Sequence, residues 1–341
     1  MGIKRVLAGL ALAAAVVPAL LQAPALADEP LKIRIGWGSM PAHLIPALYQ
    51  DTSALKHYGK SYVVEPQQFS ASTPQITALA SGDIDFAAFS PSAFVLGVVN
   101  ANLDLQVVAD IIQDGKPGHY SQSIYVKADS PIKTVQDLKG KTVGVNGLGS
   151  AVDNALRAML AKNGMNPKTD VRVVETSFAN ILPMLNDGKI DAGPIQQPMA
   201  SKLVKEGKYR LLFNSADAMG PTQFVALVGR KSFLDAHRAQ LMDFFEDHVR
   251  AIRWIMDPKN RDKALPIIAK ASVRPVEQMS YLFTDIDYYR DPWGLPDIAG
   301  LQRAINVSAE LGVVPKTIEV SPDHVDLSFV EEAKKRIEAN P

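Results

Sequence analysis

Apolar and polar positions along this chain follow a pattern that occurs twice. The segment Leu79-Ala-Ser-Gly82-Asp-Ile84-Asp85 is similar to a second segment, Leu185-Asn-Asp-Gly188-Lys-Ile190-Asp191. In both copies a glycine follows an apolar helix end, and a short strand is expected to begin at the Ile-Asp pair. Each copy reads as alternating strands and helices, which predicts a mostly parallel sheet flanked by helices. We therefore expect two related α/β lobes that face a cleft.

The repeat extends upstream, and two strand-like segments connect its halves. Lys32–Ser39 and Lys141–Ser150 both read as a strand followed by a Gly/Ser turn. Gln122–Lys127 and Gln223–Val228 are the candidate crossover strands, which would make the second lobe an insertion into the first. The domain boundaries expected from this pattern are 28–121 with 225–341 for the first lobe, and 122–224 for the second.

The chain after Arg230 has mainly helical spacing of apolar residues. We expect these helices to pack back onto the first lobe. The last one is expected to be capped by Ser328. The expected helical segments are Phe233–Met256, Ala264–Lys270, Leu301–Leu311 and Glu331–Ile337.

The first residues have the pattern of a secretory signal peptide. Lys4-Arg5 is followed by the apolar run Val6–Leu21, and Ala25-Leu-Ala27 has the small-x-small form of a cleavage site. A membrane anchor is the alternative, but the run contains Pro18 and is shorter than the roughly 20 residues that a spanning helix needs. Cleavage after Ala27 would release residues 28–341 into the periplasm.

Composition excludes several classes of function. The chain has 36 basic and 36 acidic residues, so it lacks the basic surplus that nucleic-acid binding favours. It has no cysteine, hence no thiol nucleophile, thiolate metal ligand or disulfide. Its six histidines lack metal-binding spacing, and no G-x-S-x-G nucleophile motif occurs. We expect a monomeric binding protein without a metal or other cofactor, and not an enzyme.

Ligand contacts are expected at the turns after the carboxyl ends of the strands, where open α/β sheets place their ligands. The candidates in the first lobe are Trp37, Gly38, Ser39, Ser72, Thr73, Phe89 and Ser90. Those in the second lobe are Gly149, Ser150, Ser177, Gln196 and Gln197. Tyr120 and Thr222 lie beside the crossovers.

Several of these turns place Ser, Thr or Gly just before a helix, which favours an anionic ligand. Free backbone N–H groups and the positive end of the helix dipole stabilise an anion there by roughly 0.3–1 kcal/mol per helix. The alternative is that Ser72, Ser150 and Ser177 are ordinary helix caps. Gly147 and Gly149 do not make a nucleotide fingerprint, because Val152 stands where a third glycine would fall.

Aromatic and charged residues near these turns suggest an organic ligand. Trp37, Phe89, Tyr120 and Phe178 could provide aromatic walls, or could fill the lobe cores. His43, in the first turn of a helix, is expected at the surface, whereas His119 neighbours the hinge. Arg290 could reach the cleft or pair with Asp287 or Asp291. The ligand class that fits best is an organic sulfonate or carboxylate.

These segments together resemble solute-binding proteins of ATP-binding-cassette importers. The resemblance rests on the signal peptide, Ile33-Arg-Ile-Gly-Trp37, both Gly-x-Ile-Asp turns, and Asp129-Ser-Pro-Ile132 leading to Asp137-Leu-Lys-Gly-Lys-Thr-Val-Gly144. The most similar group binds sulfonates, taurine, nitrate and thiamine precursors.

The resemblance implies a type II periplasmic-binding-protein fold, with two sheets flanked by helices and a two-strand hinge. It also implies closure on one small molecule, which is handed to a membrane permease. Enzymes of the same superfamily, among them a desulfinase, rely on cysteine. Two alternatives stay open: a neutral heterocycle such as a thiamine-precursor pyrimidine as ligand, and a sensory role at a membrane receptor.

Overall fold

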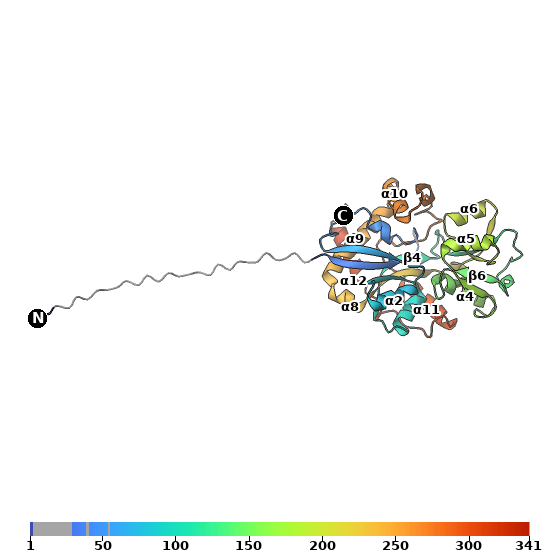
Figure 1. The fold of residues 1–341 in the computed structure, drawn as a ribbon, viewed down its shortest axis with the longest axis horizontal. Helices are drawn as coiled ribbons and strands as arrows, with labels where there is room; N and C mark the ends of the chain where they lie inside the picture. Colours follow the sequence, from blue (N-terminus) through green and yellow to red (C-terminus); the bar gives the residue numbers. More distant parts are fainter. Residues whose placement is uncertain (3–28, 39–40, 54, 341) are drawn as a thin grey trace.

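The structure, a computed structural model, describes residues 1–2, 29–38, 41–53 and 55–340. It has two α/β lobes side by side, with the second lobe drawn in green in Figure 1. The two-lobed α/β class expected from the sequence is confirmed. The predicted signal peptide lies outside the described residues, except for Met1 and Gly2. Within the described ranges, no helix has both the length and the apolarity needed to cross a bilayer.

The first lobe is built on a five-stranded sheet with strand order β2-β1-β3-β10-β4. β1 runs parallel to β2 and β3, whereas β10 runs antiparallel to β3 and β4. The expectation of a mostly parallel sheet was wrong for this lobe. The sheet is mixed, because β10 returns from the second lobe and runs opposite to its neighbours. The strands are β1 Leu31–Trp37, β2 Tyr62–Gln68, β3 Phe86–Phe89, β4 Leu105–Asp114 and β10 Thr222–Arg230.

The second lobe has a three-stranded sheet, β8-β5-β9, and a parallel pair, β6-β7. β5 is antiparallel to both of its neighbours. A parallel bridge between Val143 and Ala192 connects the pair to the end of the three-stranded sheet. The strands are β5 Ser123–Lys127, β6 Thr142–Val145, β7 Arg172–Glu175, β8 Gly193–Pro194 and β9 Tyr209–Asn214.

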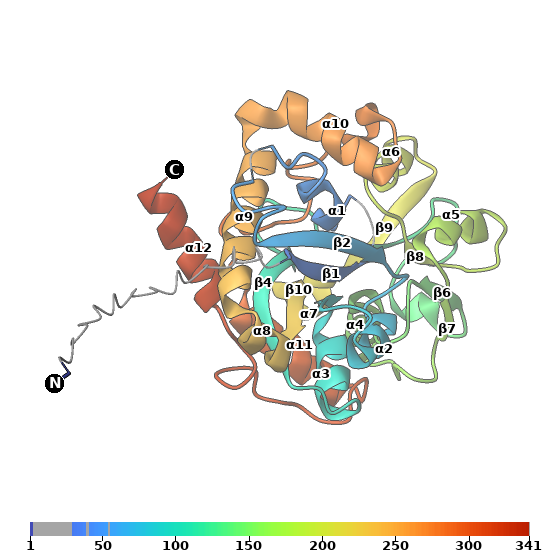
Figure 2. The same ribbon diagram turned by 60° about the vertical axis from the view of Figure 1, so that its left-hand side comes forward.

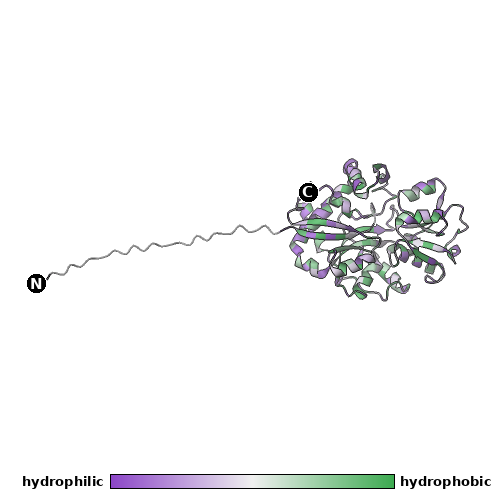
Figure 3. Cartoon of the chain, in the orientation of Figure 1, coloured by the Kyte–Doolittle hydropathy of each residue, from purple (hydrophilic) through white to green (hydrophobic). Residues whose placement is uncertain are grey.

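Helices cover the sheets of both lobes (Figure 2), and apolar and polar residues alternate around them (Figure 3). The first lobe carries α1 Ile45–Leu48, α2 Pro74–Ser81, α3 Pro91–Val99, α8 Lys231–Ala236, α9 Arg238–Met256, α10 Arg261–Ser272, α11 Ile298–Glu310 and α12 Ser328–Ala339. The second carries α4 Ala151–Lys162, α5 Phe178–Asn186, α6 Met199–Lys205 and α7 Ser215–Met219. The 3-10 helices are η1 Gln136–Leu138, η2 Pro258–Asn260 and η3 Val276–Met279.

The repeated Gly-x-Ile-Asp segment makes the same connection in both lobes. The Asp85 N–H donates to the Arg34 carbonyl in the first strand of its lobe, and Asp85 Oδ2 accepts the N–H of Arg34 at 2.8 Å. In the second lobe Asp191 Oδ2 accepts the N–H of Thr142, also at 2.8 Å. The preceding glycines adopt φ of +79° and +69°, a conformation that favours glycine. In each lobe the repeated segment thus binds, through its aspartate, to the first strand of the repeat, β1 or β6.

Two expectations about the carboxyl-terminal helices need correction. The segment 233–256 is not one helix, since α8 and α9 meet at His237. Ser328 does not cap the last helix from outside but is its first residue, with Leu327 at the cap position. The Ser328 amide donates instead to the carboxylate of Asp326, which precedes the helix and supplies the acceptor.

Two connections form the hinge, one from β4 to β5 and one from β9 to β10. Asp114, at the end of β4, is fully buried and accepts the Gln122 N–H and the Ser121 hydroxyl, each at 2.7 Å. Gln223, at the start of β10, is also fully buried and donates to Asp110 Oδ1 at 2.7 Å. Each crossing is therefore held by a buried polar side chain.

Burial raises the pKa of Asp114 to about 7, which makes the stability of the hinge depend on pH. The folded chain binds a proton at the Asp114 carboxyl more tightly than the unfolded chain does. Between about pH 4 and 7 the contribution of Asp114 to the free energy of unfolding therefore falls as pH rises. An asparagine at this position would keep the shape without titrating. We expect D114N to gain stability relative to the parent chain across this window, by up to about 1.4 kcal/mol per pH unit. Urea unfolding from pH 4 to 8 measures this, and a constant difference would contradict it.

Candidate ligand-binding cleft

A cavity of about 60 Å³ lies between the lobes, and we call it the inner cavity. Its described lining comes from both lobes and from the hinge, and none of these residues carries a formal charge at neutral pH. The lining consists of Gly38, Ala42, His43, Ser70, Ala71, Ser72, Gln75, Ile112, Gln122, Asn146, Ser150, Ala151, Val152, Phe178, Gln196, Phe224, Val225 and Tyr288.

The amino end of α4 supplies the second lobe's part of the inner cavity. Ser150 is the buried N-cap of this helix. Its hydroxyl oxygen accepts the Asp153 N–H at 3.3 Å, and its O–H donates to Asn146 Oδ1 at 3.0 Å. Among the residues described, no acceptor binds the amides of Ala151 and Val152, which line the cavity. Two free N–H groups and the positive end of a 12-residue helix therefore face the space.

The amino end of α2 faces the same cavity from the first lobe. Ser70, Ala71 and Ser72 precede this helix and line the cavity, and their amides have no acceptor within the described part of the chain. The Ser72 hydroxyl accepts the Ser90 N–H at 3.1 Å, while Thr73 holds the cap position. Ser72 is therefore not the cap of α2 but links two turns beneath the cavity.

The lobes touch beside the inner cavity. Ser92 Oγ donates to the Gly149 carbonyl at 2.5 Å, and Thr73 Oγ1 donates to the Leu148 carbonyl at 3.1 Å. A third bond joins Asn154 Nδ2 to Ser308 Oγ at 2.6 Å. Each of these bonds joins residues of different lobes, so the described arrangement has the lobes closed on one another.

The structure corrects the expected position of His43. Its side chain is only 8% exposed and lines the inner cavity instead of the surface. The Nδ1 atom accepts the Gly38 N–H at 3.1 Å. Burial and the nearby Arg290 guanidinium lower the pKa of His43 to about 3. The Arg290 guanidinium donates to the Ala42 carbonyl, so the loop that carries His43 lies against the carboxyl-terminal part of the chain.

The other two charged candidates do not line the inner cavity. Arg290 is 5% exposed, pairs with Asp287 at 2.8 Å and donates to the Ala42 carbonyl at 2.9 Å. It thus pairs with Asp287, as one alternative had it, but in the interior and not at the surface. His119 is exposed, and its ring packs edge-on against Tyr289.

The remaining predicted residues fall into three groups. Ser39 lies outside the described residues. Gly38, Ser72, Ser150 and Gln196 line the inner cavity, while Tyr120 and Gln197 line a small hollow next to it. The others lie elsewhere. Phe89 and Thr222 are buried, Ser177 is exposed, and Thr73, Ser90 and Gly149 make contacts between the lobes. Trp37 packs on the core, and its buried indole N–H has no partner among the described residues.

The expected ligand contact of Phe89 was wrong, because its side chain is buried in the core of the first lobe. Strand β3 is buried on both faces, and Phe89 packs in the apolar cluster formed with α3 and α11. The residue after it, Ser90, caps α3 by accepting the Ala93 N–H. The aromatic residue that does line the cavity is Phe178, at the amino end of α5.

Sequence reasoning missed several cavity residues. Asn146 follows β6 directly, so its position after a strand end was a usable signal. Gln75 lies within α2, and its side chain binds the backbone of β3 through Ala88. Tyr288 donates to Gln122 Oε1 at 2.5 Å and comes from a segment far away in sequence, for which no local pattern gives a signal.

A larger space, of about 420 Å³, adjoins the inner cavity, and we call it the outer chamber. The two share Phe178 and Gln196 in their linings. One wall comes from α5, α6 and the segment between them, and includes Leu182, Ile195, Pro198 and Lys202. The opposite wall comes from Arg274, Glu277 and Gln278 near η3. The outer chamber thus also lies between the lobes.

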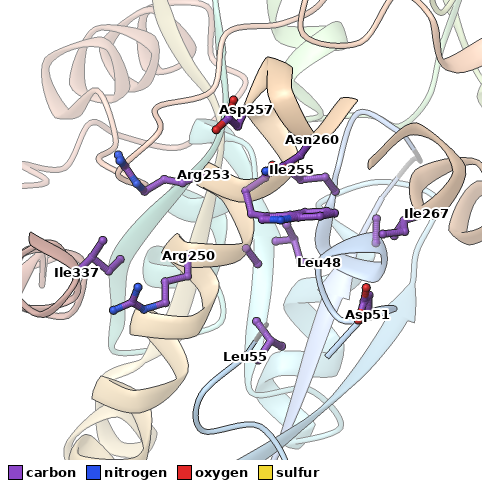
Figure 4. Close-up of a pocket in the computed structure, with 13 residues that line it drawn as sticks. Leu48, Asp51, Leu55, Arg250, Arg253, Ile255, Asp257, Asn260, Ile267 and Ile337 are labelled. Carbon is purple, nitrogen blue, oxygen red and sulfur yellow. The ribbon is translucent and has the colours of Figure 1, made fainter. Parts of the chain in front are cut away.

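A separate pocket of about 410 Å³ lies within the first lobe (Figure 4). Leu48, Trp254, Ile255 and Ile267 contribute its apolar surface, and Arg250 stands at its edge. Closure of the two lobes would not change a pocket that one lobe forms alone. No three His, Asp or Glu side chains in the described ranges gather as they would around a metal ion.

The two lobes and the cleft between them give this chain the fold of two-lobed periplasmic binding proteins, and similar solved structures share this fold. The alkanesulfonate-binding protein SsuA from Xanthomonas axonopodis pv. citri, bound to MOPS, has a TM-score of 0.67 at 23% identity, covering 88% of this chain and all of that one. The periplasmic nitrate-binding protein NrtA from Synechocystis PCC 6803 has a TM-score of 0.68 at 16% identity, covering 91% and 90%.

The sequence matches the model of the NMT1-like family over residues 26–269, so the chain belongs to this family. A putative aliphatic sulfonates-binding protein of Escherichia coli K12 is 31% identical over 152 residues. That match spans 44% of this chain and 45% of the relative, less than half the length of either.

Proposed function

We propose that this chain is the substrate-binding component of an ATP-binding-cassette import system, and that it closes on a small organic anion. The observation that carries the proposal is that free amides from both lobes line one cavity: those of Ala151 and Val152 at the amino end of α4, and those of residues 70–72, which precede α2. An anion there would contact both lobes, which is what stabilises a closed form over an open one. The sulfonate- and nitrate-binding proteins of the same fold support this assignment.

The dimensions of the cleft favour an organic anion over a bare inorganic one. The inner cavity, at about 60 Å³, has room for a compact head group, whereas whole ligands usually occupy about 300–1,000 Å³. The outer chamber, at about 420 Å³, offers the remaining space, with apolar surface for an organic body from Leu182, Ile195 and Pro198. We place a sulfonate or carboxylate head in the inner cavity and its organic body in the outer chamber.

The wider setting is part of the same proposal. The chain is exported, and its signal peptide is cleaved after Ala27. The first lobe consists of residues 28–121 and 225–341, and the second of residues 122–224. As a monomer, the protein delivers its ligand to a membrane permease. Without cysteine it has no thiol for covalent chemistry, so we propose binding and not catalysis.

One observation favours a second candidate. The described lining of the inner cavity has no positively charged side chain, which would also suit a neutral heterocycle such as a pyrimidine. The free helix amides argue for the anion, because they would stay unsatisfied against an apolar ring face.

A thermal-shift screen separates the two. The mature chain, refolded free of ligand, is heated with alkanesulfonates, taurine, nitrate, aromatic carboxylates or pyrimidines. A ligand at about 100 times its dissociation constant adds roughly 2.7 kcal/mol of stability. We expect shifts from organic anions. Shifts from neutral pyrimidines alone would replace the anion with the second candidate, and no shift from any compound would refute both.

A further inference from the structure

We propose that His43 selects the head group of the ligand, by donating a hydrogen bond from Nε2 of a neutral imidazole to an oxygen of the bound anion. This inference rests on the proposed function and adds a specific residue and protonation state to it. The sequence pattern predicted His43 at the surface, so this role depends on the structure alone.

The tautomer of His43 follows from its one described hydrogen bond. The partner is the backbone N–H of Gly38, which can only donate, and the Gly38 nitrogen lies 3.1 Å from Nδ1. Nδ1 must therefore be the unprotonated acceptor, and the ring proton sits on Nε2. A Cβ on Gly38 would lie 3.2 Å from the His43 ring, so glycine permits this close approach.

The Nε2–H group has no described acceptor. The side chain is 8% exposed, and its ring lines the inner cavity together with the amino end of α4. Because the ring lines the cavity and this N–H has no acceptor among the described residues, a ligand oxygen on the cavity side of the ring would receive its hydrogen bond. The donor belongs to the first lobe and the α4 amides to the second, so one oxyanion would bind both.

The surroundings keep this donor neutral. The Arg290 guanidinium lies close to the ring, and together with burial it lowers the pKa of His43 to about 3. Arg290 is itself paired with Asp287, so its charge is already compensated within the first lobe. His43 therefore acts as a hydrogen-bond donor and not as a cation over the physiological pH range.

Two variants separate the donor from the shape of the side chain. Glutamine can accept the Gly38 N–H through its carbonyl oxygen and donate through its amide, whereas methionine has a similar volume, cannot donate and accepts only weakly. The probe is ethanesulfonate, followed by each anion that shifts melting in the thermal screen. We expect H43M to weaken binding by about tenfold to a hundredfold, the range for a hydrogen bond to a charged group, and H43Q to stay within about fivefold.

Three readouts make the outcome decisive. H119Q, a change at an exposed histidine, is the matched control and should bind as the parent chain does. Nitrogen-15 NMR of the ligand-free protein should show the His43 proton on Nε2, and a proton on Nδ1 would overturn the proposal. Parent-like binding by H43M would also overturn it and leave the proposed function intact. Failure of the parent chain to bind any anion would instead refute the proposed function.

Discussion

Alanine in place of Gly147 is expected to weaken binding of an anion by roughly 5- to 150-fold, with little change in the stability of the unliganded chain. A Cβ on Gly147, in the second lobe, would lie 2.7 Å from the Ala71 Cβ in the first lobe. Both atoms are fixed to the backbone, so no side-chain rotation relieves the overlap. Overpacking of this kind costs about 1–3 kcal/mol. The open form avoids the overlap, so the cost falls on closure alone. Calorimetric titration with the best anion and ligand-free melting measure the two effects.

The neighbour across the interface provides the control. The double variant A71G/G147A removes the Ala71 methyl group with which the methyl group introduced at position 147 would overlap. Its affinity should therefore recover most of the way to that of A71G alone. Gly147 does not adopt a positive φ, so alanine is compatible with the local backbone. If G147A binds as tightly as the parent chain, the lobes of the bound form do not meet at this contact.

Methionine in place of Arg290 is expected to lower the free energy of unfolding by about 3–5 kcal/mol. Arg290 is 5% exposed and Asp287 is 1% exposed, and their side chains meet at 2.8 Å. Removal of the guanidinium leaves a buried carboxylate without its counter-charge, which is strongly destabilising. The Ala42 carbonyl also loses its donor, so the loop that carries His43 is weakened. Urea unfolding at pH 7 measures the loss.

An exposed ion pair gives the matched comparison. Lys32 and Glu65 are separated by 2.9 Å, with 60% and 48% of their side chains exposed. K32M should cost less than about 1 kcal/mol, as exposed pairs contribute little. The double variant R290M/D287N should recover part of the loss, because the uncompensated charge is gone. An R290M variant no less stable than K32M would show that the pair does not hold this segment.

The fold could be predicted from the sequence where the pattern is local. The two Gly-x-Ile-Asp segments identified the repeat, and Asp85 and Asp191 make equivalent bonds to the first strand of each lobe. The candidate crossovers Gln122–Lys127 and Gln223–Val228 were also visible as strand-like segments, one between the copies and one after the second copy. Strand direction was less accessible, because β10 enters the first sheet after the whole second lobe has intervened.

The site could be predicted only in part. The cap of α4 at Ser150 was readable, since a serine stands between a glycine turn and an apolar helix. The burial of His43 was not, because it depends on Arg290, which lies far away along the chain and binds the Ala42 carbonyl beside it. Phe89 shows the opposite error. An aromatic residue at a strand end satisfies the pattern of a cleft wall, but its direction depends on packing with α3 and α11.

The central claim is that an anion binds where α2 and α4 meet, and amide NMR tests it most directly. A titration of the nitrogen-15-labelled mature chain with the best anion from the thermal screen would be followed at every resolved amide. We predict the largest shifts at Ala151, Val152, Ala71 and Ser72, whose N–H groups lack acceptors in the described structure. Shifts confined to Leu48, Ala251 and Ile267, around the pocket of Figure 4, would contradict the account.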